Sequence, residues 1–536
     1  MNDLASVRDP RAFVDAYTRV AKPLYTARGE AWWALATTGS DEAAAQVRDT
    51  DLALRTLHAD ADRAAWIREQ LESIDDPQLE RCLVTLLPMY EQNPASEDAR
   101  AAMSARIAEL QKAYATFRPE VDGAKVSAGD IATALTDSDD SDHREAMWTA
   151  AHAIGAEVAE PIREAARARN EVARSHGYRD HYAMALAHQE IDEDWLFDLL
   201  NRLEKLTRDP WRKQKAVLDA RLASRFEIDA DALRPWHYAD PFLQRVPKDG
   251  AVTLDPWYAD VDLVDIATRF YDGLGMNVRD VLERSDLDPR DGKNPHAFCT
   301  HIDRSGDIRI LCNMQNNERW MGTLLHELGH AAYERYLDPE LPWLLRRAAH
   351  TLTTEAIAMW MGRQAREVDL LTEYVDAPAF EITPLRGELR RRQALGMLLL
   401  VRWVLVMSHF ERALYADPDR EDLDELWVKL REKYQGITYP EGRVAPDWAA
   451  KIHFAIAPVY YHNYLLGELL ASQLSSTLLE ESGDRSVVDS QYVGEALIAR
   501  VFAPGRSLGW DALVEQATGH PLSTAPFVRE FVHRDR

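Results

Sequence analysis

The chain has 536 residues, with 89 acidic and 63 basic side chains, which give a formal net charge of −26. Hydrophobic residues make up 46% and charged residues 28%, while glycine and proline are scarce, so a disordered tail, a collagen-like rod and a disulfide scaffold are excluded. The acidic balance argues against nucleic acid as a partner, because phosphate binding requires a basic surface. A cationic peptide or a metal ion suits this surface better.

The first part of the chain is predicted to be a stack of helices. From Arg11 to about Arg225, apolar residues recur at spacings of three and four, and no strand alternation stands out. The acidic run 137–142 is expected to be a surface loop or the start of a helix. Residues 227–260 combine four prolines with several aromatic residues, a pattern typical of an ordered loop.

One β-hairpin is predicted, from segments 296–303 and 307–314 around Arg304, Ser305 and Gly306. Asn316 and Asn317 are plausible helix caps, and helical patterns then continue almost to the end. We find no repeat or linker that would separate independent domains. The pattern therefore favours one large α-helical body in two lobes.

Three features of the sequence favour a soluble protein of the cytoplasm. The N-terminal segment is charged throughout and has no apolar region typical of a signal peptide. The most apolar stretch, 394–407, contains Arg402 and is too short to span a bilayer, so we expect a buried helix. Cys82, Cys299 and Cys312 are a sparse set that suits a reducing compartment, and whether Cys299 pairs with Cys312 stays open.

The strongest chemical signal is the sequence His326-Glu327-Leu328-Gly329-His330, flanked by good helix formers. On a helix the two histidines lie one turn apart on the same face, so both imidazoles can bind one Zn²⁺. Glu327 then stands beside the metal, where it can activate a water molecule. Such a motif also arises by chance, so a third ligand is needed.

Glu355 is the candidate for that third ligand. It follows His330 by 25 positions across a loop with Pro339 and Pro342, a distance that suits a helix, a turn and a returning helix. Its segment is otherwise uncharged, and metal ligation would remove the cost of burying its carboxylate. Glu334 and Glu340 are rivals, although their closeness to His330 would strain the geometry.

At this point the chain resembles the zinc peptidyl-dipeptidases of the angiotensin-converting enzyme type. The string HELGHAAYERYLDPELPWLLRRAAHTLTTEAIA is similar to that family's zinc-binding segment, with a loop one residue longer. Residues 430–437 (LREKYQGI) match another family segment closely. Phe13, Val14, Tyr17 and 30–33 resemble its opening helices, and Trp510, Thr518, Gly519 and Pro521 resemble its last helical turn region.

The resemblance implies a mainly α fold, with two lobes around a deep central cleft and one small antiparallel β-hairpin beside the zinc site. Residues 1–536 would form a single zinc metallopeptidase domain. Within it, 1–110 would be N-terminal helices that act as a lid, 296–360 would hold the hairpin and the zinc-binding helices, and 425–536 would complete the site.

The resemblance also implies further site residues. His453 and Tyr464 would donate hydrogen bonds to the developing oxyanion, although one inserted residue leaves Tyr460 and Tyr461 as rivals for Tyr464. The substrate's C-terminal carboxylate would be bound by three residues, Gln244, Lys451 and Tyr461. On the hairpin, His296 and Ala297 would hold an extended peptide, and His301 is left as structural.

Several positions depart from the family pattern. Trp427 and Arg431 fit one anion site, but the arginine expected near residues 181–186 is missing. At the second site the family's arginine falls on Asn463, so we do not expect strong chloride activation. Met359 replaces an acidic residue after the third ligand, so the ligands must be supported from elsewhere. The family's disulfide spacing is not reproduced by Cys299 and Cys312.

The predicted function is therefore a zinc peptidase with one Zn²⁺ per chain, acting on short peptides that carry a free C-terminal carboxylate and releasing C-terminal dipeptides. An oligoendopeptidase or a tailoring peptidase on the same scaffold is the first alternative. A non-catalytic peptide- or metal-binding homologue is the second, and the intact Glu327 argues against it. The sequence does not give the natural substrate or the oligomeric state.

Overall fold

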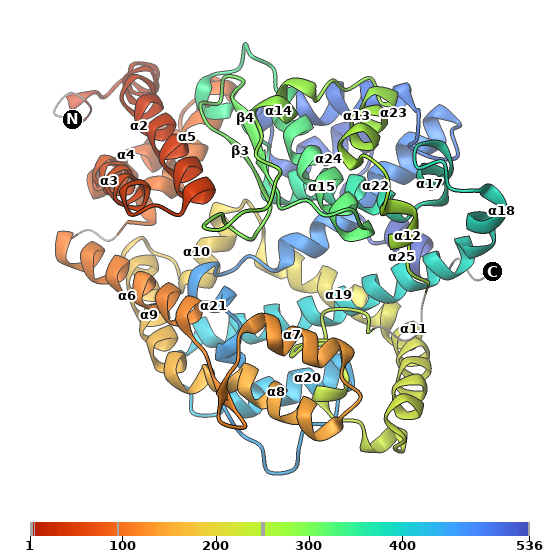
Figure 1. The fold of residues 1–536 in the computed structure, drawn as a ribbon. Coiled ribbons are helices and arrows are strands. Elements are labelled where there is room, and N and C mark those ends of the chain that lie inside the picture. The colour runs from red at the N-terminus through yellow and green to blue at the C-terminus, as the bar shows by residue number, and fades with distance from the viewer. Residues whose placement is uncertain (1–3, 5, 94–95, 248–251, 534–536) are drawn as a thin grey trace. The chain divides into compact units, whose positions relative to one another are not determined.

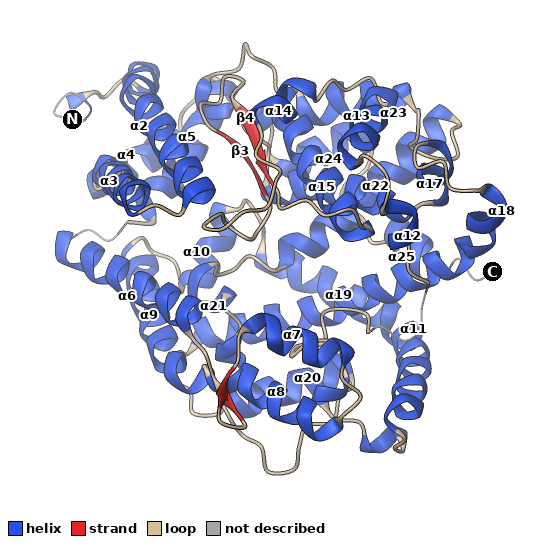
Figure 2. Ribbon diagram, in the orientation of Figure 1, coloured by secondary structure: helices blue, strands red, loops and turns tan. Residues whose placement is uncertain are grey.

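Helices dominate the computed structural model, which describes residues 4, 6–93, 96–247 and 252–533 (Figures 1 and 2). Strands in this described part are confined to two short hairpins. The mainly α prediction is therefore confirmed. By compactness the chain divides into two units, 1–95 with 253–389 and 466–527, and 96–252 with 390–465 and 528–536. Three of these boundaries fall inside helices, namely α19 (Arg386–Ala416), α22 (His462–Ser482) and α25 (Ala525–Phe531).

The first unit holds the N-terminal helices, the predicted hairpin and the HExxH motif. Its elements are α2 (Pro10–Thr38), α3 (Asp41–Leu57), α4 (Ala61–Leu71), α5 (Pro77–Glu91), α12 (Asp255–Tyr258), α13 (Leu263–Gly273), α14 (Arg279–Arg284), β3 (Phe298–His301), β4 (Ile308–Leu311), α15 (Glu318–Arg335), η3 (Trp343–Leu345), α16 (Thr351–Arg363), η4 (Gln364–Arg366), α17 (Val368–Glu373), α18 (Ala379–Ile382), η5 (Thr383–Leu385), most of α22 (His462–Ser482), α23 (Gln491–Leu497), η7 (Ile498–Phe502), η8 (Gly505–Ser507), α24 (Trp510–Thr518) and the start of α25 (Ala525–Phe531).

The second unit holds most of the remaining helices. Its elements are α6 (Glu97–Thr116), β1 (Glu120–Val121), β2 (Ala124–Lys125), α7 (Ala128–Asp137), α8 (Ser141–Ala153), α9 (Gly155–Ser175), α10 (His181–His188), α11 (Glu193–Phe226), η1 (Ala230–Ala232), η2 (Pro235–His237), most of α19 (Arg386–Ala416), α20 (Leu423–Gln435), η6 (Asp447–Ala450) and α21 (His453–Ile456). The acidic run 137–142 spans the end of α7 and the start of α8, where Asp140 caps the helix.

The predicted hairpin is present but shorter than expected. β3 and β4 pair antiparallel, with Phe298 opposite Leu311 and His301 opposite Ile308. His296 and Ala297 therefore lie directly before the strand. A second hairpin, β1 with β2, was missed because each strand has only two residues. Its turn residues, Asp122 and Gly123, both have positive φ, as an Asp-Gly hairpin turn requires.

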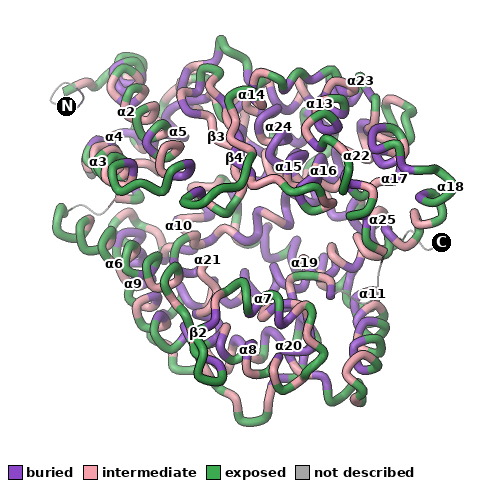
Figure 3. Tube along the Cα trace, viewed as in Figure 1, coloured by how far each residue is buried: buried purple, intermediate pink, exposed green. Residues whose placement is uncertain are grey.

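The apolar stretch 394–407 lies in α19 and is largely buried, as predicted (Figure 3). Residues 379–416 are long and apolar enough to cross a membrane by length and composition alone, with a mean hydropathy of 1.5 in the best window. However, 61% of that window is buried inside the protein, and a core helix meets the same criteria.

The N-terminal helices share a core with the loop between α15 and α16. Phe13 and Tyr17 of α2 belong to one apolar cluster with Trp343 and Leu344 of η3. In addition, the buried Arg304 guanidinium at the hairpin tip lies 4.2 Å from the centre of the Trp343 ring and 4.9 Å from that of Tyr25. The lid role of 1–110 and the central cleft stay predictions.

The packing of α15 against α16 requires small residues at their contact. A β-carbon built on Gly329 would lie 2.8 Å from Ala358 Cα, and one on Gly362 would lie 3.0 Å from the Gly322 carbonyl oxygen. Real side chains do not approach a backbone so closely, so Gly329 sets how near the two helices come. Asn317 fixes where α15 begins, because its side chain accepts the Trp320 backbone N–H at 3.0 Å, as the sequence predicted.

This close contact generates a stability prediction. Gly329→Ala should lower the free energy of unfolding by about 1–3 kcal/mol, because overpacking outweighs the gain in helix propensity. Urea denaturation measures the change. Gly396→Ala in α19 is the matched control, since its added β-carbon would meet only Val246 Cγ2 at 3.8 Å. Equal stability of the two variants would contradict the prediction.

Candidate functional site

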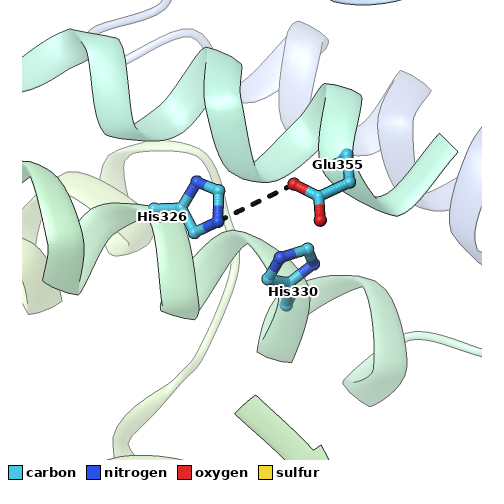
Figure 4. Close-up of side chains that lie close together, drawn as sticks. All are labelled: His326, His330 and Glu355. Carbon is cyan, nitrogen blue, oxygen red and sulfur yellow. Dashed lines mark ion pairs between the residues drawn. The ribbon is translucent and has the colours of Figure 1, made fainter. Parts of the chain in front are cut away.

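The two histidines of the HExxH motif and Glu355 come together between α15 and α16 (Figure 4). One ligand atom from each of the three residues lies within 4.8 Å of the others, and His326 Nε2 is 3.9 Å from Glu355 Oε2. Among the described residues this is the one group of histidine, cysteine or acidic side chains close enough to hold a metal ion. Two imidazoles and a carboxylate form a donor set that suits Zn²⁺.

Both histidines are kept neutral, as metal ligation requires. Burial lowers the pKa of His326 to about 4, and burial with the neighbouring His326 lowers that of His330 to about 3. A neutral imidazole that binds a metal through Nε2 carries its proton on Nδ1 and must donate it to a partner.

α16 supplies a partner for each ring. The backbone of Ala358 accepts a hydrogen bond from His326, and His330 Nδ1 lies 2.7 Å from the Thr354 hydroxyl oxygen. These contacts supply the support that Met359 cannot give. Sequence reasoning missed Thr354, although its place directly before Glu355 put it on the same turn of helix.

Glu327 lies next to this cluster and is buried, with 6% of its surface exposed. Burial and, to a lesser degree, the nearby Glu355 raise its pKa to about 8, while a hydrogen bond from the Cys299 backbone opposes that shift. The N–H of β3 therefore fixes the carboxylate from the hairpin side. A carboxyl group with this pKa can exchange a proton near neutral pH.

The rival third ligands point elsewhere. Glu334 accepts a hydrogen bond from His301 Nδ1 at 2.9 Å, and His301 Nε2 accepts the Gly306 N–H at 3.0 Å. Glu340 is exposed. His301 therefore joins the hairpin to α15.

All three cysteines of the chain are free thiols, so Cys299 and Cys312 do not form a disulfide.

The residues expected at the substrate carboxylate form a second cluster, which lies within the second unit. Lys451 Nζ donates to Gln244 Oε1 at 2.8 Å, and the Tyr461 hydroxyl donates to the same oxygen at 3.0 Å. Burial lowers the pKa of Lys451 to about 8, so this side chain is still charged in most molecules at pH 7. The cluster offers a cation and two polar groups to an anion.

The loop that carries Gln244 is held in place by hydrogen bonds. The Asp240 carboxylate accepts the backbone N–H groups of Phe242, Gln244 and Arg245 at 2.8–2.9 Å. From α20, Gln435 Nε2 donates to the carbonyls of Phe242 and Leu243 at 2.9 and 3.0 Å. Gln435 is distant from this loop in sequence, and Asp240 lies in an irregular segment, so periodicity could not identify either residue.

The predicted hydrogen-bond donors lie beside this second cluster. The centre of the His453 ring is 4.6 Å from that of Tyr461, and the Tyr464 ring is 5.3 Å from Tyr461 and 5.2 Å from Tyr460. Burial and the Lys451 charge lower the pKa of His453 to about 4, so the ring is neutral at pH 7. The geometry brings together all three tyrosines and does not choose between them.

Trp427 and Arg431 meet in an apolar, aromatic setting. The buried Arg431 guanidinium lies 5.6–5.9 Å from the ring centres of Trp427, Trp403, Phe242 and Tyr439. Its Nε and Nη1 atoms and the Trp427 Nε1 atom are buried without a hydrogen-bond partner among the described residues. Buried donors of this kind suit a small anion. Asn463, at the other expected anion position, instead donates to Gln189 Oε1 at 2.8 Å.

His296 and Ala297 are accessible at the entrance to β3. His296 is exposed, and its backbone N–H donates to the Asn294 side chain at 2.9 Å. Both residues precede the first paired position, Phe298. Contact with a peptide would therefore come from the segment before the strand.

Comparison with known families shows to which family the chain that carries this candidate metal site belongs. Residues 134–533, which include the HExxH motif and Glu355, match peptidase family M3. The chain belongs to peptidase family M3. Residues 5–209 match the angiotensin-converting enzyme family, M2, which confirms the resemblance inferred from the sequence. Both families are zinc-dependent peptidases.

Individual relatives are similar over about half of this chain. Angiotensin-converting enzyme of Haematobia irritans exigua is 22% identical over 51% of this chain and 48% of its own length. The Sus scrofa enzyme is 24% identical over 51% of this chain and 21% of its length. Thermostable carboxypeptidase 1 of Thermus thermophilus is 26% identical over 46% of this chain and 52% of its length. The match thus spans about half of these relatives or less.

Zinc dependence of family M3 agrees with the donor set of His326, His330 and Glu355. The neutral rings, their orienting hydrogen bonds and the nearby Glu327 carboxylate fit such a zinc site. The centres of the two rings are 4.9 Å apart, and the rings are nearly perpendicular, with an interplanar angle of 88°.

The Thr354 contact generates a prediction about metal affinity. Thr354→Val keeps the shape of the side chain but removes the acceptor for His330 Nδ1–H, so zinc affinity should fall about 10–100-fold. Competition with a fluorescent chelator measures this. Thr354→Ser, which retains the hydroxyl, should stay close to the wild type. A valine variant that binds zinc as tightly as the serine variant would show that the contact does not support the ligand.

Proposed function

We propose that the chain is a zinc metallopeptidase that hydrolyses short peptides and releases dipeptides from their C-termini. The observation that carries the peptidase proposal is the convergence of His326, His330 and Glu355 beside a buried Glu327. The shared hydrogen bonding of Lys451 and Tyr461 to Gln244 supports recognition of a terminal carboxylate.

In this proposal His326, His330 and Glu355 hold the zinc ion. When bound, Zn²⁺ acts as a Lewis acid on the peptide carbonyl and lowers the pKa of water. Glu327 takes a proton from the attacking water and later passes it to the leaving amine. His453 and Tyr464 donate hydrogen bonds to the carbonyl oxygen as negative charge develops there.

Recognition of the substrate end sets the cleavage position. Lys451, Gln244 and Tyr461 would bind the free carboxylate, and the segment at His296 and Ala297 would contact the extended peptide. We further propose that Trp427 and Arg431 bind an anion but that chloride has little effect on turnover, because Asn463 replaces an arginine at the second position.

Two other activities remain as alternatives on the same scaffold. An oligoendopeptidase or tailoring peptidase would use the same zinc site without anchoring a terminus. A relative is named thermostable carboxypeptidase, so carboxypeptidase activity is the other alternative. Mass spectrometry of a digested peptide library separates these activities, because it reports how far each cut lies from the C-terminus. Cuts two residues from free C-termini are expected, and cuts with no fixed distance would contradict the proposal.

The role of Glu327 gives a prediction for catalysis. Glu327→Gln keeps the size of the side chain but cannot accept the proton, so kcat should fall about 10²–10⁴-fold. Zinc content, measured by atomic emission, should stay near one ion per chain. A zinc-loaded variant with near wild-type turnover would defeat the assignment of Glu327 as general base.

The role of Lys451 gives a prediction for substrate binding and its pH dependence. Because burial lowers the pKa of Lys451 to about 8, the ammonium is charged below pH 8 and loses its charge above it. KM for free-acid peptides should therefore rise as the pH increases above 8, and this rise should disappear in Lys451→Met. Steady-state kinetics on matched free-acid and amidated peptides measure both effects. Equal cleavage of the two peptides by the wild type would contradict carboxylate anchoring.

A further inference from the structure

The turn between α21 and α22 contains a strained residue. Val459 has φ of +53° and only 1% of its surface is exposed. A β-branched side chain in the left-handed region clashes with its own backbone, so residues of this type rarely adopt that conformation. Strain of this kind persists only where the surrounding structure imposes it, and it concentrates at functional sites.

Two side chains, from α19 and from the end of α10, hold both backbone polar groups of Val459. Its N–H donates to Glu411 Oε1 at 2.7 Å, and its carbonyl oxygen accepts a hydrogen bond from Gln189 Nε2 at 3.0 Å. Glu411 is buried, with 4% exposed, and its neighbour Leu414 on the same helix is fully buried. We call Glu411 and Gln189 the turn clamp.

The clamp also reaches the first turn of α22. Gln189 Oε1 lies 3.1 Å from His462 Nε2 and accepts the Asn463 side-chain N–H at 2.8 Å. One amide group therefore fixes the strained residue together with the residues that lead to Tyr464. Gln189 Nε2 also donates to the Ala185 carbonyl at 3.0 Å, so the clamp is tied to α10.

α21, on the other side of the turn, is anchored independently. Arg169 of α9 donates to the carbonyls of Phe454 and Ala455 at 3.2 and 2.6 Å, and to the Tyr415 hydroxyl at 3.0 Å. His453 begins α21 and is thus held from this side. The conformation of the turn then decides where Tyr461 and Tyr464 lie relative to His453.

We propose that Glu411 and Gln189 are positioning residues that hold Val459 in its left-handed conformation and so align Tyr461 and Tyr464 with His453. The inference rests on the proposed function, which gives these three residues their roles. If Val459 relaxed to negative φ, the chain after it would change direction and displace Tyr461 from the His453 ring.

The chemistry of Glu411 indicates which substitution preserves the clamp. Burial raises the pKa of Glu411 to about 8, while the Val459 N–H and the Arg169 charge oppose the shift. Arg169, Tyr182 and Tyr415 are the other titratable groups that interact with this carboxyl group. The hydrogen bond needs only an acceptor oxygen at Oε1, so a glutamine should replace Glu411 and a methionine should not.

The test compares four variants of the full, zinc-loaded chain on one free-acid peptide. Glu411→Met should lower kcat about 10–100-fold, because small displacements of catalytic groups reduce rates by such factors. Glu411→Gln should stay within about threefold of the wild type on the same argument. Leu414→Ala is the matched control: it should destabilise the same helix but removes no hydrogen bond to the turn, so kcat per folded molecule should be unchanged.

The decisive variant is Glu411→Met combined with Val459→Gly. Glycine adopts positive φ without strain, so the turn no longer needs the clamp, and kcat should recover about tenfold over Glu411→Met alone. If kcat does not recover in the double variant, or if Leu414→Ala lowers kcat as much as Glu411→Met does, the proposed role of the turn clamp is wrong. If the wild-type chain cleaves no peptide, both proposals fail, whereas an active wild type with normal kcat in Glu411→Met overturns this inference alone.

Discussion

The candidate metal site of His326, His330 and Glu355 depends on the close approach of α15 and α16. Gly329 against Ala358, and Gly362 against Gly322, leave no room for side chains between the two helices. A third helix enforces the same geometry, because a β-carbon on Gly467 of α22 would lie 3.3 Å from Glu355 Cβ. Glu355 can meet His326 and His330 only because these backbones pack without intervening side chains. Gly329, the fourth residue of the HExxH motif, therefore has a structural role, because it allows α16 to pack closely against α15.

Burial shifts the protonation equilibria of titratable groups in both clusters. Near the metal cluster it raises the pKa of Glu327 to about 8 and keeps both histidines neutral. In the second unit it lowers the pKa of Lys451 to about 8 and that of His453 to about 4. The same physical effect thus shifts acids and bases oppositely, and it leaves groups that can exchange protons near neutral pH.

The sequence predicted those features that depend on local spacing. His326 and His330 are one helical turn apart, and Glu355 follows at the length of a helix and a turn, so their meeting could be expected. Lys451, Gln244 and Tyr461 required the family resemblance, since more than 200 positions separate Gln244 from Lys451. Thr354, Glu411 and Gln189 were missed because their roles depend on a hydrogen bond to one atom, which leaves no periodic pattern. The β1–β2 hairpin was missed although Asp122-Gly123 is a turn signal, because two-residue strands have no alternation to detect.

The three native thiols, of which Cys82 and Cys312 are buried and Cys299 is half-buried, have a practical consequence for work on this chain. Cys82, Cys299 and Cys312 are unpaired, and burial raises the pKa of Cys82 and Cys312 to about 12 and that of Cys299 well above its usual range. Alkylating reagents attack the thiolate, which is nearly absent from such groups at neutral pH. A surface cysteine introduced by mutagenesis would therefore react selectively, so spectroscopic probes could be attached to the wild-type background without first removing its native cysteines.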